Sequence, residues 1–185
     1  MFTSAIRTLA TASLLAASAL VAHAENPMVG GAPMYAEKNI VENAVNSKDH
    51  TTLVAAVKAA GLVETLEGKG PYTVFAPTNA AFDALPAGTV ETLLKPENKE
   101  NLTKILTCHV VAADAMSSAI SGMIKDDGGE HDVKTVGGCV LRAKEDGGKL
   151  MLTDETGGTA TVTIADVKQS NGVIHVIDKV LLPKG

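Results

Sequence analysis

The chain has 185 residues and carries 16 basic against 21 acidic side chains, a formal net charge of −5 at pH 7. This acidic balance disfavours nucleic acid and anionic membranes as partners, because both attract a basic protein face. The length suits one domain with a core of its own. Only 3% of the residues are aromatic and none is Trp, so we expect that core to be built from Val, Leu, Ile and Ala.

The first 24 residues have the pattern of a secretory signal peptide. Arg7 is the only charged residue before position 25, an apolar run covers 14–21, and 22–24 reads Ala-His-Ala, which fits a small-residue cleavage site. A membrane anchor is the alternative, but the apolar run is much shorter than the roughly 20 residues of a spanning helix. The pattern therefore predicts cleavage after Ala24, a secreted or periplasmic location, and no membrane span.

Residues 25–38 are predicted to form a flexible N-terminal extension. The segment contains two Pro and two Gly and shows little helical or strand periodicity, which is typical of linkers. The folded domain is then expected to span 39–184.

The first half of this domain is predicted to be mainly helical, because apolar residues recur there at helical spacing. Thr51 or Asp49 is expected to cap the second helix, and Gly61 is expected to end it. The expected helices cover 39–47, 51–60, 62–66, 89–94, 96–106 and 115–124.

One strand is predicted within this helical half. Tyr72–Phe75 is an apolar, β-prone run that lies between two prolines. Thr78 or Asn79 is expected to cap a helix that begins at Ala80, so we assign Asn79 a structural role.

From residue 128 onwards the sequence is typical of strands. Gly-Gly pairs begin at positions 128, 137, 147 and 157, and short runs rich in β-branched residues separate them. A phosphate-binding loop is the functional alternative, but no pair is followed by Gly-Lys-Ser/Thr. The regular spacing predicts an antiparallel meander with tight turns.

The last strand is predicted at Val173–Ile177. Every residue in it except His175 is aliphatic, and such a run is expected to be buried on both faces of a sheet. The pair Asn171-Gly172 just before it is a strong turn signal. Helices followed by strands predict the α+β class.

Cys108 and Cys139 are the two cysteines of the chain. An even number of cysteines in an exported protein favours a disulfide bond between them. The alternative is two buried free thiols, since unpaired Cys behaves as a small apolar residue.

Three segments resemble, in the same order, the conserved blocks of the fasciclin domain, here as a bacterial secreted single-domain protein. They are 72–82 (YTVFAPTNAAF), 105–111 (ILTCHVV) and 171–183 (NGVIHVIDKVLLP), and Cys108 stands where the family usually has Tyr. The resemblance covers 39–184. It implies an α+β wedge in which a helical layer packs on a twisted antiparallel β-sandwich.

The same resemblance implies a function. Fasciclin domains are non-enzymatic modules of cell adhesion and extracellular matrix, so the expected partner is a cell-surface or matrix protein or glycan. In human matrix members an Asp-Ile pair before the last block is linked to integrin binding, and Asp166-Val167 occupies that place. The residues on either side differ from the human motif, so only an unidentified surface partner carries over. The alternative for Asp166 is a solvated turn acid.

The sequence predicts no enzyme, no metal site and no cofactor. His109 and His175 lie in apolar runs, where a histidine is most often a structural residue with satisfied hydrogen bonds. Cys108 or Ser170 paired with a histidine is the catalytic alternative, but the chain lacks Gly-x-Ser-x-Gly and HExxH motifs. A second function class stays open, a periplasmic protein that binds a small apolar ligand between sheet and helices. An enclosed pocket lined by the last strand would favour it.

Overall fold

A computed structural model describes residues 26–184 of the chain. The predicted signal peptide, 1–24, therefore lies outside the described residues. The helices are α1 (Ile40–Ala44), α2 (Thr51–Ala60), α3 (Val63–Glu67), α4 (Asn79–Asp83), α5 (Thr89–Leu93), α6 (Lys99–Thr107) and α7 (Ser117–Asp126), with 3-10 turns η1 (Lys48–His50) and η2 (Pro96–Asn98). No helix in the described range is long and apolar enough to cross a membrane.

The strands form one large sheet and one small hairpin. They are β1 (Met28–Val29), β2 (Ala32–Pro33), β3 (Tyr72–Pro77), β4 (Val110–Val111), β5 (Glu130–Lys134), β6 (Val140–Asp146), β7 (Lys149–Thr153), β8 (Thr159–Gln169) and β9 (Gly172–Ile177). The large sheet has the order β4-β3-β9-β8-β7-β6-β5. Strands β5 to β9 run as the predicted antiparallel meander. The α+β class is confirmed.

The early strand and the last strand lie side by side. β3 pairs with β9 in parallel, from Tyr72 opposite Gly172 to Pro77 opposite Ile177. The sheet is therefore mostly antiparallel, with one parallel pair in its interior next to the edge strand β4. Because parallel strands need a crossover connection, the chain between β3 and β9 carries four helices and five strands of the fold.

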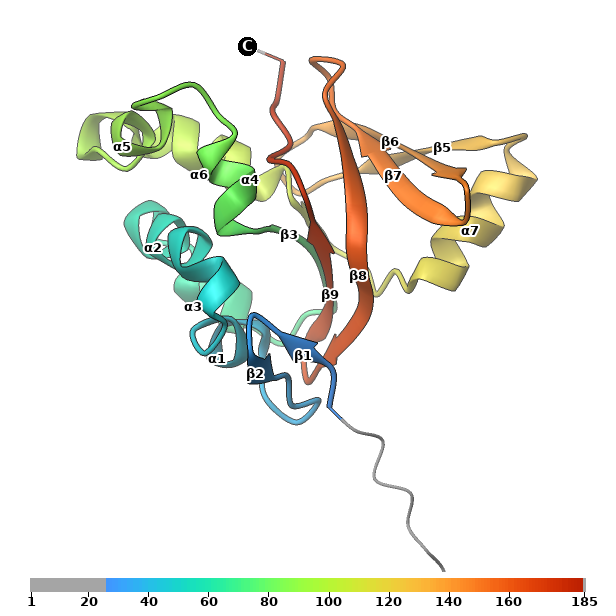
Figure 1. Ribbon diagram of the computed structural model, residues 1–185, viewed down its shortest axis with the longest axis horizontal. Helices are drawn as coiled ribbons and strands as arrows, with labels where there is room; N and C mark the ends of the chain where they lie inside the picture. The colour runs from blue at the N-terminus through green and yellow to red at the C-terminus, as the bar shows by residue number, and fades with distance from the viewer. Residues whose placement is uncertain (1–25, 185) are drawn as a thin grey trace, which may run out of the picture.

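Strand β8 joins the two parts of the sheet. Its first residues, 159–161, pair with β7, whereas 162–169 pair with β9 and contain two register shifts. Figure 1 shows α1 to α6 on one side of β3, β9 and β8, and α7 beside β5, β6 and β7. The two register shifts lie in the part of β8 that pairs with β9. Such irregularities increase the local twist of a strand.

Two apolar cores result from this arrangement. The helix-side core lies between the first six helices and the sheet, and Val74, Val167 and Ile174 belong to it. The far-side core lies between α7 and the meander, and it includes Phe75 and Ile177. Because β3 and β9 contribute residues to both cores, these strands are buried on both faces, as the unbroken apolar pattern of β9 predicts.

The described part of the predicted extension, 26–38, differs from the expectation of a flexible segment. β1 and β2 form a hairpin around Gly30-Gly31, both at positive φ, and Val29 and Met34 are buried in the helix-side core. Two glycines between short strands match the requirement of a tight hairpin turn. The glycines and prolines that suggest a linker therefore serve a packed hairpin.

The start of α2 also differs from the prediction. Neither Thr51 nor Asp49 caps this helix, and its N-cap residue, His50, makes no capping bond through its side chain. The amide of Asn79 supplies the cap from another element: its Oδ1 accepts from the Thr52 N–H at 3.0 Å and its Nδ2 donates to the Lys48 carbonyl at 2.8 Å. Thr78, one of the two predicted candidates, caps α4.

Candidate functional site

Asp166 lies inside β8, where its backbone adopts a left-handed conformation with φ of 59°. Its carboxylate accepts a hydrogen bond from the Ser117 N–H at 2.6 Å and a second one from the Ser117 hydroxyl. An acceptor at this place satisfies a free N–H at the start of α7. Asp166 is half-buried and positions a helix, so it is not a solvated turn acid before a strand.

Val167 has no exposed surface and packs in the helix-side core. Its side chain therefore cannot contact a partner while β8 keeps this conformation. The pair Asp166-Val167 occupies the place that the family suggests, but only Asp166 reaches the surface.

His175 links this region to β9. The ring is fully buried, its Nδ1 accepts from the Asp166 N–H at 3.2 Å, and its Nε2 donates to the Ala115 carbonyl at 2.8 Å. Burial lowers the pKa of His175 despite opposing effects of the Ala115 carbonyl, Asp166 and Asp114. Ser117, Asp166 and His175 are thus close together, but the serine donates to the aspartate and not to the imidazole. A catalytic triad requires the opposite connection, with serine bonded to histidine.

His109 is also buried and bonded at both nitrogens. Nδ1 donates to the Ile105 carbonyl at 2.8 Å, and Nε2 accepts from the Leu181 N–H at 2.9 Å. Burial lowers the pKa of His109 to about 4, against smaller raising effects of the Ile105 hydrogen bond and Asp154. The ring therefore joins α6 to the segment after β9.

Cys108 and Cys139 form a disulfide bond, with 5.4 Å between their α-carbons. Both residues are buried. The bond connects the end of α6 to the residue before β6, so Cys108 is not available as a free nucleophile. Ser170, the other candidate nucleophile, is exposed at the turn between β8 and β9. Within 26–184 no cluster of three His, Cys, Asp or Glu side chains could hold a metal ion.

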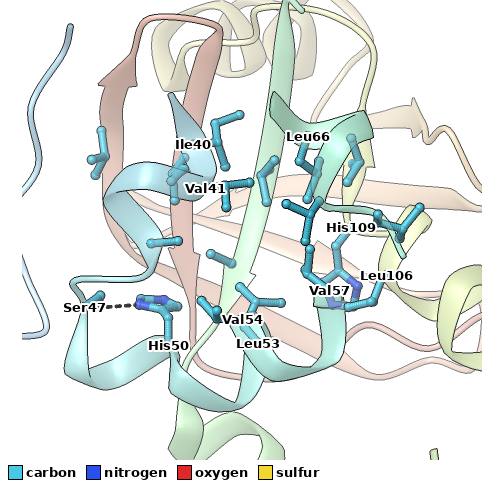
Figure 2. Close-up of a pocket in the computed structure, with 18 of the residues that line it drawn as sticks. Ile40, Val41, Ser47, His50, Leu53, Val54, Val57, Leu66, Leu106 and His109 are labelled. Carbon is cyan, nitrogen blue, oxygen red and sulfur yellow. Dashed lines mark hydrogen bonds between the residues drawn. The ribbon is translucent and has the colours of Figure 1, made fainter. Parts of the chain in front are cut away.

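An apolar cavity of about 50 Å³ lies between the helical layer and the sheet. Figure 2 shows side chains that line it, drawn as sticks. They come from α1, α2, α3 and α6 on one side and from the sheet on the other, and they include Ile40, Leu53, Val57, Leu66, Val74 and Ile174. We call this space the apolar cavity. Ile174 belongs to β9, so the last strand lines it.

His50 also lines the apolar cavity, and sequence reasoning did not indicate this position. The residue is 1% exposed, and its Nδ1 lies 2.8 Å from the Ser47 hydroxyl oxygen (Figure 2). Its Nε2 has no hydrogen-bond partner, which is true of no other buried side-chain nitrogen or oxygen in the described part of the chain. Burial lowers the pKa of His50, although Asp49 and the Ala76 carbonyl, which approaches the ring without reaching the geometry of a hydrogen bond, oppose the shift.

A second hollow lies on the surface at the turn between β8 and β9. This polar cleft has a volume of about 320 Å³, and its lining includes Lys69, Asp114, Lys168 and Ser170, all of which are exposed. Neither lysine forms an ion pair with another described residue. Lys168, one of the residues that line the cleft, lies two residues after Asp166 in the sequence. The volume of the cleft falls in the range of small-ligand sites, about 300–1,000 Å³.

Comparison with protein families identifies one match. Residues 48–183 fit the model of the fasciclin domain. Helix α1 and the β1–β2 hairpin precede the matched range.

Known proteins from bacteria and an insect are similar to the chain. Protein sll1483 of Synechocystis is 51% identical over 144 residues, which cover 78% of this chain and 73% of that protein. The cell surface glycolipoprotein MPB83 of Mycobacterium bovis is 35% identical over 166 residues, which cover 86% and 68%. A solved structure of a FAS1 domain pair from the insect cell adhesion molecule Fasciclin I has a TM-score of 0.70 at 17% identity, and the match covers 78% of this chain and 51% of that one. At this low identity the insect structure supports the fold alone.

Proposed function

The chain belongs to the fasciclin domain family, and from this premise we propose that it is an exported, non-enzymatic interaction module that binds a cell-surface or matrix protein or glycan. The observation that carries the proposal is the family match over 48–183. The name of the similar MPB83, a cell surface glycolipoprotein, places that protein at a cell surface.

Export, to the periplasm or the outside of the cell, is part of the proposal. It is supported by the signal-peptide pattern of 1–24 and by the disulfide bond between Cys108 and Cys139. Disulfides persist mainly in oxidising compartments.

The state of the reactive side chains supports a non-enzymatic role. Both ring nitrogens of His109 and of His175 form hydrogen bonds with backbone groups. Cys108 is held in a disulfide. A nucleophile needs an adjacent base within hydrogen-bond reach, and these side chains do not provide such a pair.

We assign partner binding to the surface around the polar cleft. Lys168 lines the cleft, and Asp166 lies two residues before it on the same strand and is bonded to Ser117, the residue after Met116 of the lining. The exposed charges of the cleft have both signs, Lys69 and Lys168 together with Asp114, so this surface suits a partner that offers basic as well as acidic groups. Long-range charge attraction at such a surface weakens as salt is added.

Gene deletion followed by complementation tests this proposal. We expect the deletion strain to attach less to surfaces or to matrix, and the wild-type gene to restore attachment. Lys168→Ala and Asp166→Asn should restore it only in part. Asn tolerates the left-handed backbone and retains an acceptor for Ser117, so Asp166→Asn removes mainly the charge.

Lys134→Ala is the matched control, because Lys134 is an exposed lysine on β5, away from the cleft, and it should complement fully. Unchanged attachment of the deletion strain would overturn the adhesive function. Full complementation by both cleft variants would remove the assigned surface and leave the function.

A further inference from the structure

We propose that the apolar cavity is a binding site for a slim aliphatic alcohol, whose hydroxyl group forms a hydrogen bond with His50. This site is separate from the polar cleft and does not depend on the adhesive function. The two sites use different surfaces: the cleft lies at the turn between β8 and β9, whereas the cavity lies under α1, α2 and α3.

The walls of the cavity favour an apolar occupant. Leu53, Val57, Leu66, Val74 and Ile174 all line it and are all buried. A water molecule needs two to four polar partners to occupy a buried space, and cavities with apolar walls stay dry. Empty space leaves the lining atoms without dispersion contacts on one side. An aliphatic group that enters would restore these contacts.

The volume sets the shape of the ligand. One water-sized group requires about 10–15 Å³ by the same measure. The apolar cavity, at about 50 Å³, therefore has room for about three to five groups of that size in a row, and a slim chain fits it better than a wide ring of six carbon atoms. A chain of about four carbon atoms fits this space.

His50 explains why the ligand should carry a hydroxyl group. The ring is buried, lines the cavity and has an Nε2 without a partner. The Ser47 hydroxyl lies 2.8 Å from Nδ1 and can either donate to it or accept from it. Nε2 is accordingly either a donor or an acceptor, and a hydroxyl group satisfies both cases. A charged head group would lose its hydration in this cavity without a compensating charge.

The helical layer contains the route of entry. Val54, Leu62 and Val63 line the cavity but are only partly buried, and exposed Lys58 lies beside them. Val54 and Lys58 belong to α2, Val63 begins α3, and Leu62 lies between the two helices. A chain longer than the cavity would leave its far end among these rim residues, so length beyond about five carbons should add little affinity.

The test is a titration of the full chain with 1-alkanols from 1-propanol to 1-octanol, followed by NMR of methyl groups and of the His50 ring nitrogens. We expect saturable shifts of the Leu66, Val57 and Ile174 methyl groups and a shift of the Nε2 resonance. Affinity should rise with chain length up to about five carbons and then level off. A rise of constant slope through 1-octanol would contradict a confined site and indicate partition to the surface.

Two variants separate the hydrogen bond from the cavity. His50→Phe keeps a flat ring and removes Nε2, so it should lower the affinity for 1-butanol about tenfold, and the affinity for n-pentane should not change. Val57→Leu should fill the cavity and abolish the binding of both 1-butanol and n-pentane. Val133→Ile, in the far-side core, is the matched control and should bind as the wild type does. Absence of saturable methyl shifts, or an unshifted Nε2 in the wild type, would overturn the proposal without any substitution.

Discussion

Three buried histidines illustrate how single residues support this fold. His109 and His175 each connect two segments that are distant in sequence, whereas His50 bonds only its neighbour Ser47. Burial lowers the pKa of all three. Each ring is therefore neutral in the folded protein near neutral pH. Protonation would place a poorly hydrated charge in the interior, and in His109 and His175 it would also remove the hydrogen bond that one ring nitrogen accepts.

The first prediction concerns His109 and pH. Its folded pKa of about 4 lies below the ordinary value of 6.5, so the unfolded chain binds the proton first as the pH falls. Stability is full above pH 6.5 and is lost progressively between 6.5 and 4, by about 2 kcal/mol from this residue at pH 5. His50 and His175 add losses of the same sign. Urea unfolding at pH 7 and pH 5 measures the difference.

The control for this prediction is His109→Gln. Glutamine supplies a donor and an acceptor but does not titrate, so the variant should be less stable at pH 7 and should lose less stability between pH 7 and pH 5. An equal loss in the variant and the wild type would show that other groups cause the acid sensitivity.

The second prediction concerns Asn79, which makes three hydrogen bonds to Lys48, Thr51 and Thr52. Asn79→Ala should cost about 1–2 kcal/mol, the upper range for loss of a helix cap. Asn98→Ala is a suitable control, because Asn98 makes one exposed bond to Thr92 and should cost less. Equal costs in chemical denaturation would argue against the cap.

Sequence reasoning reached some of these residues and missed others. Asn79, His109 and His175 stand in apolar or capping contexts that suggest structural roles. Nothing in the sequence separates His50 from a surface histidine, because its burial depends on η1 folding against the hairpin of 28–33. The position of Asp166 inside β8 was equally hidden, since a left-handed aspartate in a strand follows from the register shifts.

At the scale of elements, covalent and apolar contacts hold the helices to the sheet. The disulfide joins the end of α6 to the start of β6. At Gly137, an added Cβ atom would lie 2.9 Å from the Cys108 backbone nitrogen, so the turn before β6 approaches α6 too closely for any larger residue. This approach places the two cysteines within bonding reach.

The third prediction is that the disulfide stabilises the domain by about 3–4 kcal/mol, from the entropy of closing a loop of this length in the unfolded chain. The cysteines are 31 positions apart. Cys108→Ala with Cys139→Ala should show this loss in urea unfolding, and reduction of the wild type should lower stability to a similar level. Two titratable thiols in the unreduced, unfolded protein would contradict the bond.

The fourth prediction concerns β9, whose residue Ile174 is 6% exposed. Ile174→Ala should cost about 2–5 kcal/mol because it enlarges the space in the helix-side core. Val136→Ala serves as the control, since Val136 is 49% exposed and should change stability by at most about 0.5 kcal/mol. Similar costs at both sites would place β9 outside the core.

Most elements could be predicted, but their partners could not. Helical spacing, Gly-Gly turns and the unbroken apolar run of β9 identify the helices and the meander. The parallel pairing of β3 with β9 depends on contacts between segments a hundred residues apart, which no local pattern records. The β1–β2 hairpin was hidden because glycine and proline mark linkers and tight turns alike.

At the scale of the whole molecule, packing and buried hydrogen bonds hold the surface around the polar cleft in one conformation. Two cores fix both faces of β3 and β9, and the helical layer covers one side of the sheet (Figure 1). The buried polar groups of Gln169 and Asn171 are bonded within the protein, so the turn at the polar cleft is held rigidly. A rigid surface loses little entropy when it binds a partner.

Binding of the purified, labelled domain to cell envelopes from a strain that lacks the gene tests the proposed function most directly. The account predicts a saturable isotherm that excess unlabelled protein displaces, that weakens with added salt, and that Lys168→Ala shifts to higher concentration while Lys134→Ala does not. Binding that never saturates, or that unlabelled protein does not displace, would contradict a specific surface partner.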